Sequence, residues 1–268
     1  LSEKRFESAV NGLNENRSVI KLFNRWTKQE ISTALERIRS VHPPVNMVAM
    51  KAIWNWADKH NISKDDIPRE KDALLNLKRL SFINLNYIGE KQFTSLPKEI
   101  GNLKNLILLQ LGDIINEEMV LNRLTELPIE ICELPKLAYL HLQRNALKEL
   151  PAWIGNLTKL KELKLGGNFL TSLPKEIGKL EKLEVLTIWQ NNLEEIPKEI
   201  GFLKNLRGLD ISFNELTKLP NEITNLTELK IFLYDDEKVQ LSEEQKKWVT
   251  KLKNNGCELS GDDQNEPR

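Results

Sequence analysis

The stretch from Leu173 to Pro220 reads LPKEIGKLEKLEVLTIWQNNLEEIPKEIGFLKNLRGLDISFNELTKLP, and its second half repeats the first, so that Ile196 takes the place of Leu173. Leucine or isoleucine recurs at fixed positions, and each half carries asparagine at the same slot. Working outward, an aliphatic residue followed by proline recurs at this constant interval at Leu127, Leu150, Leu173, Ile196 and Leu219. A repeat of this length predicts a solenoid in which each unit packs on its neighbours.

Each unit contains an xLxLx core whose two-residue alternation predicts a strand with its leucines pointing inward. Seven such strands are predicted, centred on Ile83, Leu109, Leu140, Leu163, Leu186, Leu209 and Phe232. Stacked in one parallel sheet, they are connected by LPxxIGxL segments, for which proline and the apolar spacing predict a short helical turn on the convex side. That turn carries an inward-facing isoleucine, namely Ile100, Ile131, Ile154, Ile177, Ile200 or Ile223. The predicted fold class is α/β.

One asparagine per unit follows each strand, at Asn145, Asn168, Asn191 and Asn214, with Asn122 in an equivalent slot. The chain turns inward there, where backbone groups lose contact with water. Asparagine amides both donate and accept hydrogen bonds, so these residues are predicted to form a ladder along the stack. We interpret them as scaffold and not as residues that read a ligand.

The segments LPKEIGNL (residues 96–103) and LPKEIGKL (residues 173–180) resemble the 23-residue leucine-rich repeats of bacterial proteins, which are similar to those of Ras-associated scaffold and plant intracellular proteins. The resemblance covers residues 77–234. It implies a right-handed horseshoe solenoid that acts as a protein-binding scaffold, without specifying the partner.

Residues 1–76 contain no repeat and are predicted to be helical. Thr27–Glu30 forms a capping box, and a second helix is expected from Val45 to His60. The residues expected on its packed face are Val48, Ala52, Ile53 and Trp56, with Trp54 as a further candidate. This segment is either a small helical core that caps the first strand or an independent interaction domain.

Residues 235–259 are predicted to cap the other end of the solenoid. Ser242–Gln245 is a capping box that opens a helix through about Lys253, and Trp248 is expected to plug the last repeat. The polar residues 260–268 are predicted to be a disordered tail.

Two insertions interrupt the period, three residues near Tyr87–Lys91 and eight around Asp113–Leu121. Both directly follow a predicted strand, which places them on one edge of the horseshoe. They either elaborate a binding site or reflect loop drift near the end of the solenoid.

The composition excludes several kinds of partner and chemistry. Lys+Arg and Asp+Glu both number 39 among 268 residues, so no net charge attracts nucleic acid or anionic lipid. The two cysteines, Cys132 and Cys257, lie far apart in the sequence, which weakly favours a reducing, cytoplasmic compartment. No apolar run reaches the roughly 20 residues of a membrane span. The sequence starts with Leu1, so a removed signal peptide, and with it a secreted or surface location, stays open.

No phosphate-binding loop, nucleophile elbow, zinc-protease motif or calcium loop is present, and the three histidines are scattered. We therefore expect no enzyme activity, no cofactor and no metal site.

The solvent-facing strand positions are expected to form two columns across the concave sheet. One column comprises Phe82, Leu108, Tyr139, Glu162, Val185, Gly208 and Ile231, and the next comprises Asn84, Gln110, His141, Lys164, Thr187, Asp210 and Leu233. Just beyond the strands lie Gln143, Arg144, Trp189, Gln190, Ser212 and Phe213. Gly166, Gly167 and Gly208 are expected to leave room for a bulky partner group.

This surface is rich in the residue types that dominate binding interfaces. The candidate contact residues are Leu108, Tyr139, His141, Arg144, Lys164, Val185, Trp189, Asp210 and Phe213. The sequence therefore predicts a monomeric, non-enzymatic module that binds another protein on the concave face. The alternatives are a structural or assembly protein, a surface adhesin, or an effector that targets a host protein.

Overall fold

The computed structural model describes residues 47–82, 94–115, 118–120 and 123–260. The chain divides into two compact units, residues 1–50 and 51–268, and the second of them contains the solenoid. The capping box predicted at Thr27–Glu30 lies outside the described residues, as do Ile83, the insertion near Tyr87–Lys91 and Asn122.

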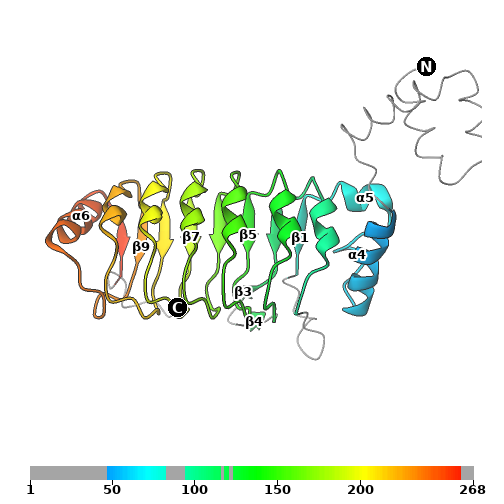
Figure 1. Cartoon of the computed structure of the whole chain (residues 1–268), viewed down its shortest axis with the longest axis horizontal. Helices are drawn as coiled ribbons and strands as arrows, with labels where there is room; N and C mark the ends of the chain where they lie inside the picture. Colours follow the sequence, from blue (N-terminus) through cyan, green and yellow to red (C-terminus); the bar gives the residue numbers. More distant parts are fainter. Residues whose placement is uncertain (1–46, 83–93, 116–117, 121–122, 261–268) are drawn as a thin grey trace, which may run out of the picture. The chain divides into compact units, whose positions relative to one another are not determined.

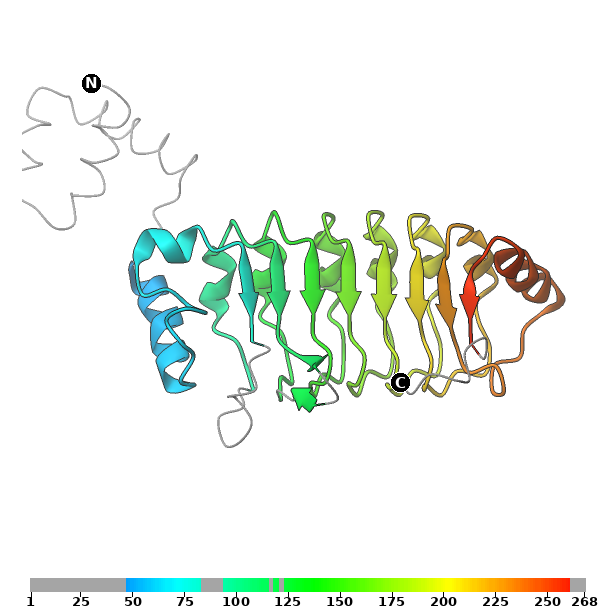
Figure 2. The same ribbon diagram turned by 180° about the vertical axis from the view of Figure 1, so that it is seen from behind.

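Eight parallel strands form one sheet and lie side by side along the solenoid in Figures 1 and 2. Their order follows the chain: β1 (Arg79–Ser81), β2 (Leu108–Gln110), β5 (Tyr139–His141), β6 (Glu162–Lys164), β7 (Val185–Thr187), β8 (Gly208–Asp210), β9 (Ile231–Leu233) and β10 (Glu258–Leu259). The register pairs residues in equivalent slots, so that Leu163 faces Leu186 and Leu186 faces Leu209. These central leucines are fully buried, which confirms the inward-facing alternation.

A row of short 3-10 helices covers the side of the solenoid opposite the sheet (Figure 2). They are η2 (Lys98–Asn102), η3 (Ile129–Glu133), η4 (Ala152–Asn156), η5 (Lys175–Lys179), η6 (Lys198–Phe202) and η7 (Asn221–Asn225). A proline precedes each helix with an extended ψ, for example ψ 143° at Pro174, and so sets the entry of the chain into the turn. The predicted inward isoleucine of every turn is buried.

The asparagine ladder is present in the four described repeats that carry it. Asn168 donates through Nδ2 to the carbonyls of Leu142 and Leu165, both at 2.9 Å, and its Oδ1 accepts from the Leu147 amide at 3.1 Å. Asn145, Asn191 and Asn214 make the equivalent bonds. Each amide therefore joins two successive repeats at a buried turn, where an unpaired backbone group is costly.

The first strand lies three positions before its predicted centre. Leu80 pairs with Leu109, and the Phe82 amide donates to the Gln110 carbonyl, so Phe82 is an inward residue with 2% exposure. The predicted place of Phe82 in the solvent-facing column was therefore wrong. Arg79 and Ser81 pair with the two column positions of β2, whereas Asn84 lies outside the described residues.

This register also changes the length of the first insertion. Phe82 now corresponds to Leu165, and Leu96 corresponds to Leu173. The interval from Phe82 to Leu96 exceeds the interval from Leu165 to Leu173 by six positions, so the insertion is six positions long and not three.

The second insertion contains an antiparallel hairpin, β3 (Asp113–Ile115) and β4 (Glu118–Val120). It lies along the lower edge of the solenoid in Figure 1, the edge at which the parallel strands end. This position agrees with the expectation that the insertion follows a strand.

The C-terminal end is capped by α6 (Glu243–Asn254), which starts at the predicted capping box on Ser242. The indole Nε1 of Trp248 donates to the Leu226 carbonyl at 3.1 Å, and its ring centre lies 5.2 Å from that of Phe232. Trp248 thus plugs the last repeat as expected. After α6 the chain adds β10, an eighth strand that the repeat pattern does not predict.

At the other end, α4 (Met47–Lys59) and α5 (Lys71–Leu75) precede β1. Ile53 and Ala57 of α4 are fully buried, and the Trp56 ring meets the Phe82 ring edge to face, with 5.9 Å between their centres. Val48, expected on the packed face, is 68% exposed. Since residues 51–76 belong to the same compact unit as the repeats, that part of the N-terminal segment packs with the first repeat.

Candidate protein-binding face

The structure places the nine candidate residues on neighbouring strands or directly after them. Leu108, Tyr139 and Val185 share one column with Glu162, Gly208 and Ile231, and His141, Lys164 and Asp210 share the next. Leu108 and His141 are only 6% and 8% exposed, so they offer little surface. On β1, by contrast, Arg79 is exposed and Ser81 is partly exposed, and on β5 and β6 Tyr139, Glu162 and Lys164 are partly exposed.

Polar side chains on β5 and β6 pair with one another. His141 Nε2 and Glu162 Oε2 lie 3.0 Å apart, and Lys164 Nζ lies 3.7 Å from the same oxygen. On β8, Asp210 Oδ1 accepts from the amide and the hydroxyl of Ser212, at 3.1 and 2.6 Å. The two carboxylates of the central sheet are thus engaged within the chain.

The same slot beyond the strand adopts a left-handed backbone in four successive repeats. Its φ is +55° at Arg144, +68° at Gly167, +52° at Gln190 and +56° at Phe213. A non-glycine residue in this region costs on the order of 1 kcal/mol. Three of the four repeats bear this cost to place a large side chain at the strand-end edge of the concave face.

Arg144 and Trp189 form a stack over two glycines. The Arg144 guanidinium carbon lies 4.5 Å from the centre of the Trp189 ring. A Cβ atom built on Gly166 would lie 2.2 Å from the Trp189 ring, and one built on Gly167 would lie 2.7 Å from Arg144 Cδ. The expectation that these two glycines leave room for a partner was wrong, because the chain's own side chains fill it.

The stack also fixes the direction of the guanidinium. Arg144 Nη1 donates to Gln190 Oε1 at 2.8 Å. Burial beside the indole lowers the pKa of Arg144 through desolvation. Among the described residues, Arg144 Nε is buried without a hydrogen-bond partner, as are Gln143 Oε1 in the same loop and Thr187 Oγ1 on the strand before Trp189.

Two large apolar side chains are exposed on the C-terminal half of the face. Phe213 is 59% exposed and Ile231 is 41% exposed. Gly208 lies between Val185 and Ile231 in register, and an added Cβ would meet only the Val185 methyl carbons, at 3.6 and 3.7 Å. Gly208 is therefore the one predicted glycine gap that the structure leaves open.

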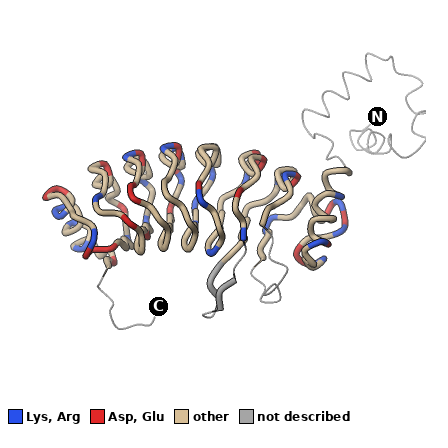
Figure 3. Tube along the Cα trace, turned by 60° about the horizontal axis from the view of Figure 1, so that its bottom comes forward, with Lys and Arg blue, Asp and Glu red and all other residues tan. Residues whose placement is uncertain are grey.

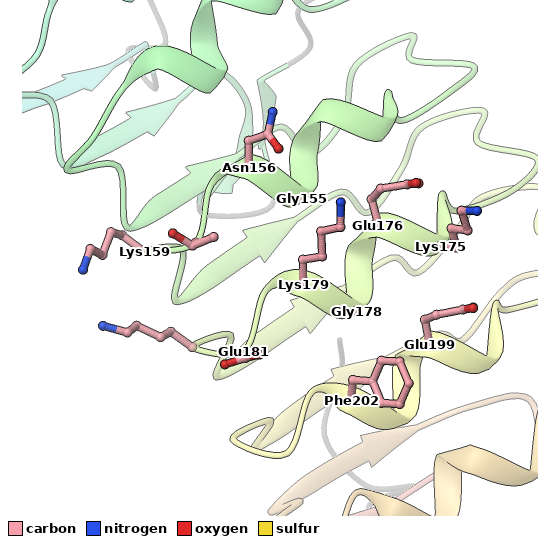
Figure 4. Close-up of a pocket in the computed structure, with 12 residues that line it drawn as sticks. Gly155, Asn156, Lys159, Lys175, Glu176, Gly178, Lys179, Glu181, Glu199 and Phe202 are labelled. Carbon is pink, nitrogen blue, oxygen red and sulfur yellow. The ribbon is translucent and has the colours of Figure 1, made fainter.

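A second surface depression lies on the convex side, across η4, η5 and η6 (Figure 4). Its rim carries lysines and glutamates that point away from the helices, together with Phe202, which is 57% exposed. Charges of both signs alternate over the repeat turns in Figure 3. This open groove lacks buried polar groups that converge on one point, so the concave face is the stronger candidate.

Within the described residues, no helix is long and apolar enough to cross a membrane, and no group of three or more His, Cys, Asp or Glu residues is arranged to hold a metal ion. Cys132 is partly buried in η3, and Cys257 is buried before β10. Neither lies on the concave sheet.

A family model described as "leucine-rich repeat region" matches residues 64–189 and 163–254. Among solved structures, the chain is 40% identical to a leucine-rich-repeat protein of Leptospira interrogans, with a TM-score of 0.56 over 70% of this chain and 43% of that one. It is 34% identical to the ectodomain of the Arabidopsis thaliana membrane receptor kinase GASSHO1/SCHENGEN3, solved in complex with CASPARIAN STRIP INTEGRITY FACTOR 2. That match has a TM-score of 0.50 and covers 61% of this chain and 19% of that one. The chain thus spans less than half the length of either structure, and no curated protein matches its sequence.

Proposed function

Because this chain belongs to the leucine-rich-repeat family, we propose that it is a non-enzymatic module that binds another protein on its concave sheet face. Leucine-rich repeats commonly serve protein interaction, but the fold hosts many unrelated functions. Which side of the solenoid binds the partner must therefore be inferred from the residues exposed on each side. The similar Arabidopsis ectodomain, which holds its own named factor, supports binding as the general activity.

The observation that carries the proposal is the left-handed row at the strand-end edge. Gly167 shows that glycine suits this slot, yet Arg144, Gln190 and Phe213 occupy it elsewhere with positive φ. Backbone strain of this kind persists only where the surrounding structure enforces it, and it clusters at functional sites. Arginine and aromatic side chains are also the residue types enriched in binding hot spots, and Trp189 lies beside them.

The exposed phenylalanines provide a matched test. Phe213 on the concave edge and Phe202 on the convex side are 59% and 57% exposed, so their substitution by alanine removes similar apolar surface. The immobilised chain is incubated with a lysate, and the proteins retained by wild type, F213A, W189A, Y139A and F202A are quantified by mass spectrometry. We expect F202A to retain the wild-type set and the three concave variants to lose it.

Equal retention by all four variants would refute the concave-face proposal. Retention of the chain itself as the main captured protein, with self-association in light scattering, would favour the assembly role instead. Loss of binding with F202A alone would move the interface to the convex groove of Figure 4.

A further inference from the structure

We propose that the concave face recognises a carboxylate of its partner, an aspartate or glutamate side chain, with Arg144 as the receiving group. The inference rests on the proposed function and adds the chemistry of the bound segment. It follows from the way the guanidinium is held and from the balance of donors and acceptors around it.

The Arg144 guanidinium is held before any partner arrives. One face lies on the Trp189 ring at 4.5 Å, and Nη1 is bonded to Gln190 Oε1 at 2.8 Å. Its aliphatic stem lies over Gly167. A long side chain that is already ordered loses little conformational entropy on binding, and a planar guanidinium presents two parallel N–H groups that match a carboxylate.

Hydrogen-bond donors outnumber acceptors at this point of the face. The guanidinium has five N–H groups, and its bond to Gln190 uses one of them. Within the described residues, the Trp189 indole N–H donates to no group, and Arg144 Nε has no partner. An added ligand therefore gains most if it brings acceptors.

Among the described residues, the carboxylates of the central sheet do not fill this role. Glu162 lies between His141 and Lys164, at 3.0 and 3.7 Å, and Asp210 accepts from Ser212. Arg144 takes part in none of the salt bridges of the described residues. A positive charge that is partly desolvated and lacks a counter-ion is complementary to an acidic group supplied from outside.

The unpaired atoms of Gln143 and Thr187 indicate what surrounds the bound carboxylate. Gln143 precedes Arg144, is only 8% exposed, and its Oε1 has no donor among the described residues. Thr187 Oγ1, on the strand that leads to Trp189, is also buried and unpaired. A main-chain segment supplies one N–H and one C=O per residue, so an extended segment around the acidic residue fits these unpaired atoms.

The test uses a phage-displayed library of random 12-residue peptides as the probe. The full chain is immobilised as wild type, R144Q and R207Q, and each is used to select peptides in parallel. Arg207 is an exposed arginine just before β8, at the opposite end of the strands, and serves as the matched control for loss of one positive charge. Thermal unfolding verifies that each variant is folded.

We expect wild type and R207Q to enrich peptides that contain Asp or Glu at a constant position, and R144Q to lose that enrichment. For a selected peptide, replacing the acidic residue by its amide should weaken binding at least tenfold, as should R144Q. Combining both changes should weaken it no further than either alone, because each removes the same interaction.

Three outcomes would overturn the inference: equal acidic enrichment on R144Q, no acidic preference on wild type, or no peptide retained by wild type. The proposed function is judged separately by W189A and F213A in the same assay. If these variants abolish peptide binding while R144Q does not, the concave face binds protein but the carboxylate inference fails. If none of the three changes affects binding, both fail.

Discussion

Two slots of the repeat recur once in each unit, on opposite sides of the solenoid, and show opposite use of glycine. On the convex side, Gly101, Gly155, Gly178 and Gly201 have no room for a side chain, since an added Cβ would lie 2.3 to 2.7 Å from a backbone oxygen of the next repeat. At the concave edge the left-handed backbone favours glycine, yet only Gly167 is glycine. At the convex slot, where atoms of the next repeat leave no space for a Cβ, nearly every unit has glycine. At the concave-edge slot, where only the positive φ disfavours other residues, the residue type varies.

The exceptions on the convex side agree with this reading. Cys132 and Thr224 occupy the glycine slot, and the unit that follows each one departs from the template. Trp153 replaces the usual glutamate after Cys132, and the helix α6 replaces a further 3-10 turn after Thr224. Both exceptions thus lie where the next unit differs from the template in sequence or in structure.

The largest loss of stability is expected from a change in the asparagine ladder. Asn168→Ala removes three hydrogen bonds and leaves one backbone N–H and two carbonyls with fewer partners. We expect the free energy of unfolding to fall by about 3 kcal/mol, measured by chemical denaturation. Asn192→Ala, at an exposed position of the next repeat, should change it by less than about 0.5 kcal/mol. Equal effects of the two variants would contradict the ladder's role.

The next prediction contrasts two glycines. Gly178→Ala places a Cβ 2.7 Å from the Glu199 backbone oxygen and should destabilise the fold by about 2 kcal/mol. Gly208→Ala makes only ordinary contacts at 3.6 Å and should stay within about 0.5 kcal/mol of wild type. The two thermal unfolding curves decide the matter: if G208A is as destabilised as G178A, Gly208 does not border an open gap.

A smaller effect of opposite sign is expected at the concave edge. Phe213→Gly relieves a left-handed φ of +56° and should raise the free energy of unfolding by about 0.5 kcal/mol, while it weakens partner binding. Phe202→Gly, in a 3-10 helix with ordinary backbone geometry, should lower stability by roughly 0.5–1 kcal/mol. Both values come from urea denaturation. A loss of stability in F213G would show that its side chain contributes packing that outweighs the strain.

The smallest effect concerns an exposed pair between repeats. Lys161 Nζ donates to Glu184 Oε1 at 2.8 Å, and this bond lowers the pKa of Glu184 and raises that of Lys161. The stabilisation from Glu184 is therefore present above the unfolded pKa of about 4.5 and is lost as pH falls through the lower folded value. Glu184→Gln should slightly lower the melting temperature at pH 7 and leave it unchanged at pH 2. The same difference at both pH values would assign it to something other than charge.

The repeat period determined most of the fold in advance. A two-residue alternation at constant spacing located β2 and β5 to β9, and one asparagine per unit predicted the ladder, because identical spacing demands identical packing. The position of the first strand was predicted wrongly because the run RLSFINLN contains two apolar alternations, Leu80 with Phe82 and Ile83 with Leu85. Only pairing with β2 decides between them. The eighth strand, Glu258–Leu259, is very short and lies outside the period, so no local pattern marks it.

The sequence predicted where the surface residues lie along the sheet, but not which side chains contact one another. Equivalent slots of successive units are neighbours, so Gly166 and Trp189 were known to be adjacent, yet the direction of the indole depends on its rotamer. The same holds for Arg144, whose left-handed backbone sends its side chain across Gly167 toward Gln190. Sequence spacing predicted the columns, while side-chain torsions decided which gaps are filled and which, such as Gly208, stay open.

The bond between Arg144 and Gln190 joins residues 46 positions apart, across three consecutive repeats. Repeat arrays gain and lose whole units, and most positions tolerate this because a unit contacts only its neighbours. A unit gained between these two residues would separate their strands by a further distance of about 4.8 Å and break the bond. The block from β5 to Gln190, just beyond β7, must therefore be copied, deleted or transplanted as a whole, whereas the repeat that follows it is free to be exchanged singly.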